Sequence, residues 1–291
     1  NNLKGNIPQE LYCLTKLQWL ELDQNFLGGT LSTNIGRLSY LTDLRLHENA
    51  FSGGIPSELG LLADCRRLFL NEINVDGTLP TELGQLRSID QFHLHINQLS
   101  GTIPTELGNI VTVDEIGLHE NNLEGSIPTE FGKLLEVAEL SLHSNELTGT
   151  IPTEISNLSK DLDYLGLFGN YLNGTIPTEL GQLSALVELH LDANELTGPI
   201  PSELGYLSNT LHQIYLFQNN LSGEIPTELG KLSRLTHFEI ENNPGLFGNL
   251  DTIVCTEASH FESLWANCLD EFVQESPEAV GHIIPDRITC S

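Results

Sequence analysis

One asparagine recurs at a nearly constant interval of 24 residues, always inside the same pattern of apolar residues. Residues 140–158 show this pattern in full as Leu-Ser-Leu-His-Ser-Asn-Glu-Leu-Thr-Gly-Thr-Ile-Pro-Thr-Glu-Ile-Ser-Asn-Leu. The column comprises Asn1, Asn25, Asn49, Asn97, Asn121, Asn145, Asn170, Asn194, Asn219 and Asn243, with Ile73 in one place and two steps of 25 residues. A fixed period of this length predicts a solenoid, in which each repeat forms one coil and contacts only neighbouring coils.

Each repeat predicts a short strand followed by a turn. In the first complete repeat, alternation directs Leu20 and Leu22 inward and Trp19, Glu21 and Asp23 outward. Strands of successive coils are expected to align in register as one parallel sheet on the concave side. The section Gly-x-Ile-Pro-Thr-Glu-Leu-Gly then crosses the convex side as a short 3-10 or helical turn, because proline suits the start of a helix. Ser or Thr beside the proline is expected to cap this turn.

The asparagine column has a structural explanation. An amide that follows the strand can bond backbone groups of adjacent coils that would otherwise be buried without partners. We expect this role rather than ligand contact. Because Ile73 has no amide, we predict a local irregularity there, with Asn71 or Asn74 as compensation.

The chain carries a strongly negative charge, with 12 Lys and Arg against 40 Asp and Glu and a net charge of −28. Nucleic acid is excluded as a partner, since phosphate binding requires a basic surface. A glutamate recurs in the convex turns, where it suits the positive end of the short helix. The resulting row of like charges predicts that salt or divalent cations stabilise the fold.

Residues 249–291 depart from the repeat, so we divide the chain into a solenoid of about ten repeats over 1–248 and a C-terminal cap over 249–291. Ser259-His-Phe-Glu262 matches a capping box. Residues at helical spacing follow it: Phe261, Leu264, Trp265, Cys268, Leu269 and Phe272. We predict an amphipathic helix that covers the last coil.

The five cysteines divide into two groups. Cys255, Cys268 and Cys290 lie in the predicted cap, where we expect a disulfide whose pairing is open. Cys13 and Cys65 stand two repeats apart, too far for a disulfide, and are expected to be buried free thiols.

Several features favour an extracellular, secreted or cell-surface location. The cysteine-containing tail is joined by three N-glycosylation sequons, at Asn157, Asn173 and Asn220. No apolar run is long enough to span a bilayer, so we expect no transmembrane segment in this stretch of chain. Apolar residues of the first coil are expected to leave an open end for self-association: Leu3, Ile7, Leu11, Leu14 and Leu17.

The motif Leu-x-Gly-x-Ile-Pro-x-Glu-Leu-Gly-x-Leu resembles the plant-type leucine-rich repeats of receptor kinases and related extracellular proteins, over residues 1–248. This resemblance implies an α/β leucine-rich repeat solenoid with a superhelical twist and a second sheet formed by the Gly-x-Ile-Pro section. The segment Asn243-Pro-Gly-Leu-Phe-Gly248 resembles the end of many such ectodomains, where a cysteine often replaces Phe247. The acidity and the tail with Cys255, Cys268 and Cys290 resemble leucine-rich repeat proteins of diatoms and related algae.

No catalytic signature was found: the sequence has no phosphate loop, nucleophile elbow, CxxC or HExxH motif. We therefore expect no enzyme activity and no cofactor, apart from a possible Ca or Zn ion. A metal hypothesis arises from His95, His119 and His143, which form a row on the outward face of the predicted sheet. Adjacent imidazoles can share a zinc ion. We favour simple duplication of a polar strand residue, because a straight row from parallel strands does not by itself give tetrahedral geometry, and a pH response is a further alternative.

A second outward group combines aromatic residues with small ones. Tyr164, Phe168, Tyr215 and Phe217 alternate with Gly166, Gly169 and Ala193, which predicts a shallow apolar platform. The candidate ligand-binding residues on this concave face are Glu139, Tyr164, Phe168, Glu188, His190, Tyr215 and Phe217.

Two functions follow from these patterns. The first is a non-enzymatic extracellular recognition module, resembling a receptor ectodomain, that binds a protein, peptide or glycan on its concave face. The alternative is a structural or adhesive cell-surface protein that self-associates or is bridged by divalent cations.

Overall fold

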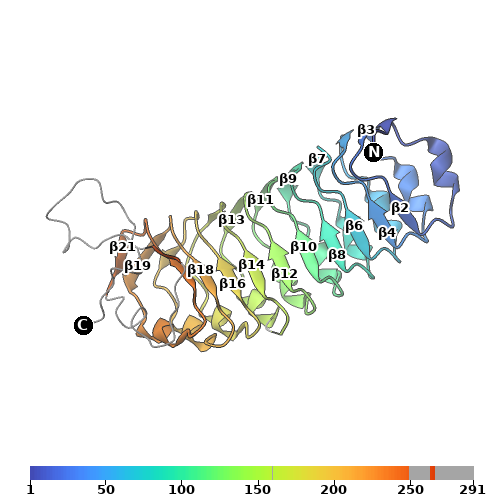
Figure 1. The fold of residues 1–291 in the computed structure, drawn as a ribbon. Helices are drawn as coiled ribbons and strands as arrows, with labels where there is room; N and C mark the ends of the chain where they lie inside the picture. Colours follow the sequence, from blue (N-terminus) through green and yellow to red (C-terminus); the bar gives the residue numbers. More distant parts are fainter. Residues whose placement is uncertain (159, 249–262, 266–291) are drawn as a thin grey trace. The chain divides into compact units, whose positions relative to one another are not determined.

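The computed structural model describes residues 1–158, 160–248 and 263–265, which are drawn in colour in Figure 1. The chain divides into two compact units, Asn1–Thr148 and Gly149–Ser291. Both units consist of coils that each contain a main-sheet strand, a short second-sheet strand and a 3-10 turn. The repeat predicted from the sequence is thereby confirmed.

The main sheet of the first unit is parallel, and its strands lie side by side in chain order (Figure 1). Its strands are β2 (Trp19–Glu21), β4 (Asp43–Arg45), β6 (Arg67–Phe69), β8 (Gln91–His93), β10 (Glu115–Gly117) and β12 (Glu139–Ser141). The register joins equivalent residues of neighbouring repeats, such as Glu115 to Glu139. Equivalent side chains therefore form straight columns along the sheet.

The second sheet that the family resemblance implied is present as further parallel strands in the first unit, but it is formed by the residues that lead into the Gly-x-Ile-Pro section, and the Ile-Pro pair lies outside the strands. These strands are β1 (Lys4–Gly5), β3 (Phe26–Thr30), β5 (Ala50–Ser52), β7 (Asp76–Thr78), β9 (Gln98–Thr102), β11 (Asn122–Gly125) and β13 (Glu146–Gly149). The turns are η1 (Gln9–Cys13), η2 (Thr33–Arg37), η3 (Ser57–Leu61), η4 (Thr81–Gln85), η5 (Thr105–Asn109) and η6 (Thr129–Lys133).

The second unit repeats this organisation with its own parallel strands. Its main-sheet strands are β14 (Tyr164–Gly166), β16 (Glu188–His190), β18 (Gln213–Tyr215), β20 (His237–Glu239) and β22 (Ser263–Trp265). Second-sheet strands are β15 (Tyr171–Leu172), β17 (Thr197–Gly198), β19 (Asn220–Glu224) and β21 (Gly245–Phe247). The turns are η7 (Thr153–Leu158), η8 (Thr178–Gln182), η9 (Ser202–Tyr206) and η10 (Thr227–Lys231).

The asparagine column makes the backbone bonds that the sequence predicted. Asn121 donates through Nδ2 to the carbonyl oxygens of Leu94 and Leu118, both at 3.1 Å. Its Oδ1 accepts the backbone N–H of Leu99 at 3.0 Å. Asn121 thus closes its own coil and ties it to the preceding one, which satisfies groups that are buried among leucines.

The predicted irregularity at Ile73 is confirmed. Asn74 adopts a positive φ of 61°, which its equivalents Gln98 and Asn122 do not, whereas the positive φ of Glu72 is shared by its equivalents in the other repeats. The backbone N–H groups of Ile73 and Val75 both donate to Oδ1 of Asn97, at 3.2 Å each. One asparagine oxygen therefore serves two backbone donors at this point of the stack.

The predicted cap of the turns is wrong in most repeats. Proline itself occupies the N-cap position, as Pro104 does before η5, and the hydroxyl of Thr105 donates to the carboxylate of Glu106 at 3.3 Å. Ser32 stands where other repeats have proline, and there the hydroxyl does accept the N–H of Asn34 at 3.2 Å. A serine or threonine after the proline lies inside the turn, where its oxygen no longer faces the free N–H groups.

Part of the predicted C-terminal helix is also wrong. Ser263–Trp265 forms strand β22, which pairs in parallel with β20 and aligns Leu264 with Phe238. The segment continues the main sheet because an uncovered strand edge offers unpaired backbone groups, and a short apolar stretch fits a strand as well as a helix. The helical cap, the disulfide of Cys255, Cys268 and Cys290, and the tail resemblance to diatom proteins rest on residues outside the described ones.

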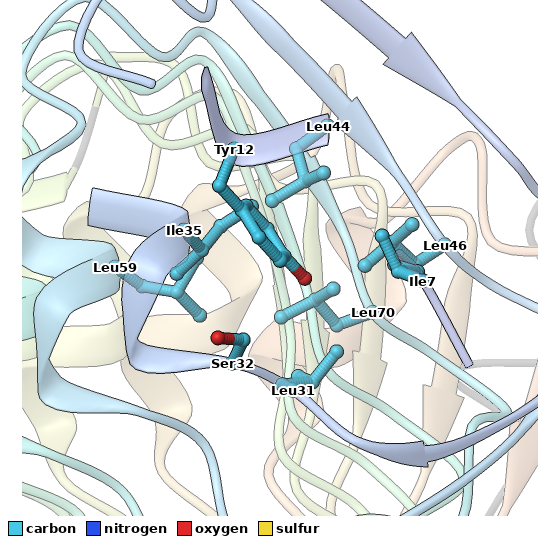
Figure 2. A pocket seen from close by; sticks show the side chains of 9 residues that line it. All are labelled: Ile7, Tyr12, Leu31, Ser32, Ile35, Leu44, Leu46, Leu59 and Leu70. Carbon is cyan, nitrogen blue, oxygen red and sulfur yellow. The ribbon is translucent and has the colours of Figure 1, made fainter. Parts of the chain in front are cut away.

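The first coil is only partly closed. Ile7 and Tyr12 are buried and, with Leu44 and Leu70, line a cavity of about 10 Å³, space for roughly one water molecule (Figure 2). Leu3 and Leu14 remain 48% and 56% exposed. The predicted open apolar end therefore exists at these two leucines, but not at Ile7.

The two cysteines of the repeats have different environments. Cys65 is buried, as predicted, and burial raises the pKa of its thiol to about 12. Cys13 is exposed, which corrects the prediction of a buried thiol. It ends turn η1 at the position that Arg37 and Gln85 occupy in later turns, on the solvent side of the coil.

None of the helices in the described ranges has the length and apolar content that a membrane span requires.

Candidate functional site

The outward face of the main sheets carries the candidate site residues. Each coil contributes the two outward residues of its strand and a third that lies two positions further along the chain. These side chains do not fill the leucine core, so the fold leaves their identity free.

The three histidines of the first unit form a stack of rings. The ring centroids of His95 and His119 lie 4.3 Å apart with planes at 10°, and those of His119 and His143 lie 4.4 Å apart at 18°. Gly117 makes room for this stack, because a Cβ there would stand 2.9 Å from Nδ1 of His95. The sequence therefore identified the residues that come together, although not the glycine that allows it.

The stack contradicts the predicted three-histidine metal site. Nitrogen lone pairs lie in the ring plane, so parallel stacked rings direct them side by side rather than to one point. Within the described ranges, no group of three or more His, Cys, Asp or Glu residues is arranged to hold a metal ion.

Two histidines of the stack, His95 and His119, are neutral at physiological pH. Burial lowers the pKa of His95 to about 3 and that of His119 to about 4, and neighbouring histidines add to both shifts. Among the described residues, the Nδ1 atoms of His95 and His119 are buried without a hydrogen-bond partner. His95 and His119 thus contribute half-buried neutral rings, rather than charge, to this face.

A buried ion pair near the stack was missed by sequence reasoning. The carboxylate of Asp43 is fully buried and binds Arg45 through two hydrogen bonds, of 3.0 and 3.1 Å, and it also pairs with Arg67. The guanidinium of Arg45 lies 5.5 Å from the ring of Phe69. The signal was present, because these residues occupy outward positions of adjacent strands in one register.

The aromatic residues of the second unit gather around His190. The ring centroid of His190 lies 5.2 Å from that of Tyr164, 4.5 Å from that of Tyr215 and 6.0 Å from that of Phe168. Phe217 belongs to the next coil along the same face, since its carbonyl accepts the N–H of Ala193 at 2.9 Å. Three of the four predicted platform residues, Tyr164, Phe168 and Tyr215, therefore lie around His190, and ligand binding by this group stays a prediction.

Carboxylates accompany these rings. Glu188 approaches His190, with 3.3 Å between Oε2 and Nε2. Burial raises the pKa of Asp192 to about 7, and the charges of Glu239 and Glu241 add to the shift. The pKa of Tyr215 is raised by burial and by Glu239, Glu188 and Asp192.

Glu139, which the sequence grouped with the platform, belongs to the first unit. There its carboxylate accepts the hydroxyl of Ser141 at 2.9 Å. The other six predicted ligand-binding residues belong to the second unit. Sequence reasoning left out Asp192, although its position between Phe168 and Phe217 in the outward column is visible in the repeat.

The three sequon asparagines lie outside the main-sheet strands. Asn157 is in η7, Asn173 follows β15 and Asn220 begins β19, and all three are exposed. Their glycosylation stays a prediction that this exposure permits.

A family model for the leucine-rich repeat matches residues 137–158, 185–207 and 210–232. No match was found among curated proteins. Among solved structures, the plant peptide hormone receptor RGFR1 in complex with RGF2 is 29% identical, with a TM-score of 0.82 over 87% of this chain and 45% of that one. The chain spans less than half the length of this receptor and of a TDR receptor, of which it covers 42%.

Two shorter proteins are matched over more of their own length. A plant ice-binding protein is 30% identical, with a TM-score of 0.69, and the match covers 84% of this chain and 78% of that protein. A leucine-rich repeat protein of Leptospira interrogans is 31% identical, with a TM-score of 0.65 and coverage of 85% and 67%.

Parallel strands, 3-10 turns and an asparagine column together define a solenoid repeat protein with an open sheet surface. This chain belongs to the leucine-rich repeat family.

Proposed function

We propose that the chain is a non-enzymatic extracellular recognition module that binds a protein or peptide on the outward face of its second unit. The observation that carries this proposal is the packing of Tyr164, His190 and Tyr215, ring against ring, at positions where the leucine core needs none of them. Half-buried aromatic side chains on a rigid sheet supply contact area at little cost in conformational entropy. The likeness to a plant peptide hormone receptor supports the same reading.

The test is selection of binders from a random peptide library displayed on phage. A Tyr164→Ala/Tyr215→Ala variant removes two rings of the platform. The matched control, Tyr171→Ala/Tyr206→Ala, removes two tyrosines of the same unit that are 54% and 69% exposed outside the main sheet. We expect selected peptides to bind the wild type and the control equally and not to bind the Tyr164→Ala/Tyr215→Ala variant.

Selected peptides that bind all three proteins alike would contradict the proposal. A glycan array probed with the same three proteins tests the sugar alternative, because sugars also stack on aromatic faces. Glycan binding that depends on Tyr164 and Tyr215, without peptide binding, would replace the peptide by a sugar at the same surface.

A second candidate function is ice binding, favoured by a row of exposed hydroxyl groups in the first unit. Thr78, Thr102 and Ser126 are exposed at equivalent positions of successive coils, which are about 5 Å apart. A Cβ at Gly125 would stand 2.8 Å from the methyl group of Thr102, so the glycine admits the threonine in a fixed orientation. A regular row of hydroxyl and methyl groups can order water, and the matched plant ice-binding protein supports this candidate.

Inhibition of ice recrystallisation tests the second candidate. Thr102→Glu places a charge inside the row, and Asn109→Glu places the same charge on an exposed residue of the same repeat outside it. Activity that is lost in the first variant and kept in the second supports ice binding. Absence of activity in the wild type would eliminate it.

A further inference from the structure

A polar cleft lies between the first two coils of the first unit. It has a volume of about 320 Å³, which is enough for a small ligand. Asn6 and Gln9 of the first coil and Thr30, Ser32 and Thr33 of the second supply its polar side chains. All five are exposed or half-buried, so these amide and hydroxyl groups can be reached from solvent.

Tyr12 forms a wall of this cleft. Its side chain is only 2% exposed, and together with Ile7, Leu31 and Ser32 it lines both the cleft and the apolar cavity shown in Figure 2. Burial raises the pKa of Tyr12, and a hydrogen bond with the backbone of Ser32 lowers it. The phenol is therefore engaged within the protein, and a ligand would meet the amides and hydroxyls.

The cleft arises where the first two turns depart from the repeat. Later turns place a glycine against the next coil, as Gly60 does, where a Cβ would stand 2.2 Å from the carbonyl oxygen of Glu82. Tyr12 occupies the place of this glycine in η1, so η1 does not pack on η2 as closely as η2 packs on η3. Ser32 stands where later turns have proline, and it leaves the space that the ring would fill.

The polar groups of the cleft are neutral. None of the described residues that line it is charged, and Asn34 replaces the glutamate that later turns have, such as Glu106. Nδ2 of Asn34 donates to Oε1 of Gln9 at 2.9 Å, so the amide of Gln9 keeps its NH₂ group as a donor. The hydroxyl of Ser32 accepts the N–H of Asn34 at 3.2 Å and keeps its own proton to donate.

We propose that this cleft, defined by Asn6, Gln9, Thr30, Ser32 and Thr33, binds a neutral sugar unit. Sugar hydroxyls donate and accept hydrogen bonds, as the amides and hydroxyls of the cleft do. A charged ligand would lose solvation there without meeting an opposite charge, and the net charge of −28 also repels anions. The site lies in the first unit and does not depend on the function proposed for the second.

The test is an array of immobilised neutral and sialylated glycans, followed by calorimetric titration with a soluble form of each neutral glycan that is retained. Gln9→Ala/Thr33→Val removes an amide and a hydroxyl from the cleft. Thr81→Val/Thr105→Val is the matched control, because these exposed threonines occupy the equivalent positions of η4 and η5. We expect the cleft variant to bind a neutral glycan about tenfold more weakly, as loss of two hydrogen bonds does, and the control to bind as the wild type does.

A further variant, Ser32→Pro, restores the residue that later turns have. The φ angle of Ser32 is −77°, which suits proline, so we expect the melting temperature to stay unchanged. The ring would fill part of the cleft and remove the hydroxyl, so binding of the neutral glycan should be lost. If Ser32→Pro lowers the melting temperature, the Gln9→Ala/Thr33→Val variant and its control still decide the question.

Absence of any neutral glycan whose binding is weakened by Gln9→Ala/Thr33→Val would overturn the cleft proposal, and so would retention of sialylated glycans alone. Glycan binding that is lost in Tyr164→Ala/Tyr215→Ala but kept in the cleft variant would also overturn it, and would support the surface of the second unit instead. Selected peptides that ignore Tyr164 and Tyr215 would overturn the proposed function and leave the cleft proposal intact.

Discussion

The ring of Tyr164 lies against Gly166, two residues along the same strand: a Cβ at Gly166 would stand 2.6 Å from both Cε1 and Oη of the tyrosine. The ring of Tyr164 therefore packs on the backbone of Gly166, in the space that a larger side chain at this position would occupy. Because Tyr164 also packs against His190, this contact fixes one edge of the proposed binding surface.

Gly166→Ala should displace Tyr164 without unfolding the chain, because the clash involves only the far end of a side chain. We expect ligand affinity to fall to the level of Tyr164→Ala, with a loss of unfolding free energy below about 1 kcal/mol. Gly84→Ala is the contrasting variant, since its Cβ would stand 2.2 Å from the carbonyl oxygen of Glu106. Backbone must move there, and we expect a loss of about 2 kcal/mol or more in urea denaturation.

The asparagine column is expected to contribute strongly to stability. Asn121→Ala leaves the N–H of Leu99 and the carbonyls of Leu94 and Leu118 without their side-chain partner. Unpaired buried polar groups cost about 1–3 kcal/mol each, so we expect a loss of about 3 kcal/mol in urea denaturation. Asn122→Ala, at the exposed neighbouring residue, is the control. Equal stability of the two variants would refute the structural role.

The histidine stack predicts sensitivity to acid. The ordinary histidine pKa is 6.5, and in the folded chain that of His95 is lowered to about 3 and that of His119 to about 4. Between these values the unfolded chain binds protons that the folded chain does not, so acidification favours unfolding. The stabilising effect of neutral rings is fully present above pH 6.5 and is lost as the pH falls towards 4.

The melting temperature of the wild type should therefore fall more steeply between pH 7 and pH 4 than that of His119→Gln. Glutamine does not titrate and keeps a planar amide beside the neighbouring rings. If the melting temperatures of the two proteins fall equally with pH across this range, the histidine stack is not the cause of the acid sensitivity.

The glutamates of the turns predict a response to salt. Glu82, Glu106 and Glu130 occupy the same position in η4, η5 and η6, so like charges recur about every 5 Å. Screening should relieve this repulsion, and we expect the melting temperature to rise from low to moderate sodium chloride. An unchanged or lower melting temperature would show that repulsion between these glutamates does not limit stability.

The adhesive alternative predicts self-association bridged by divalent cations. Light scattering in which the particle size grows only when calcium is added would favour this alternative.

Much of the fold was predictable because the residues that form each strand, turn and backbone bond recur at the same positions in every repeat. The positions of Leu140, Asn145 and Pro152 within one coil are enough to predict a strand, a backbone-binding amide and a turn. One departure, at Ile73, was predictable for the same reason. Ser263–Trp265 was not predictable, because the segment no longer follows the repeat and its pairing with β20 is set by the uncovered sheet edge.

The candidate site was predictable as columns but not as contacts. The register placed His95, His119 and His143 in one row, yet only side-chain rotamers decide whether the rings stack or converge. The ion pair between Asp43 and Arg45 and the burial of Asp192 depend on neighbouring coils in three dimensions. Gly117 and Gly166 matter because the absence of a side chain leaves room for the rings of His95 and Tyr164. A sequence pattern does not show which ring occupies that space.

Hydrogen exchange of the chain with and without a selected peptide tests the central claim most directly. Binding on the outward face of the second unit predicts slower exchange in β14, β16 and β18 and in the residues that follow each strand, up to Phe168, Asp192 and Phe217. Exchange in the turns η8 to η10 should stay unchanged. Protection confined to these turns or to the second-sheet strands would place the ligand elsewhere and contradict the account.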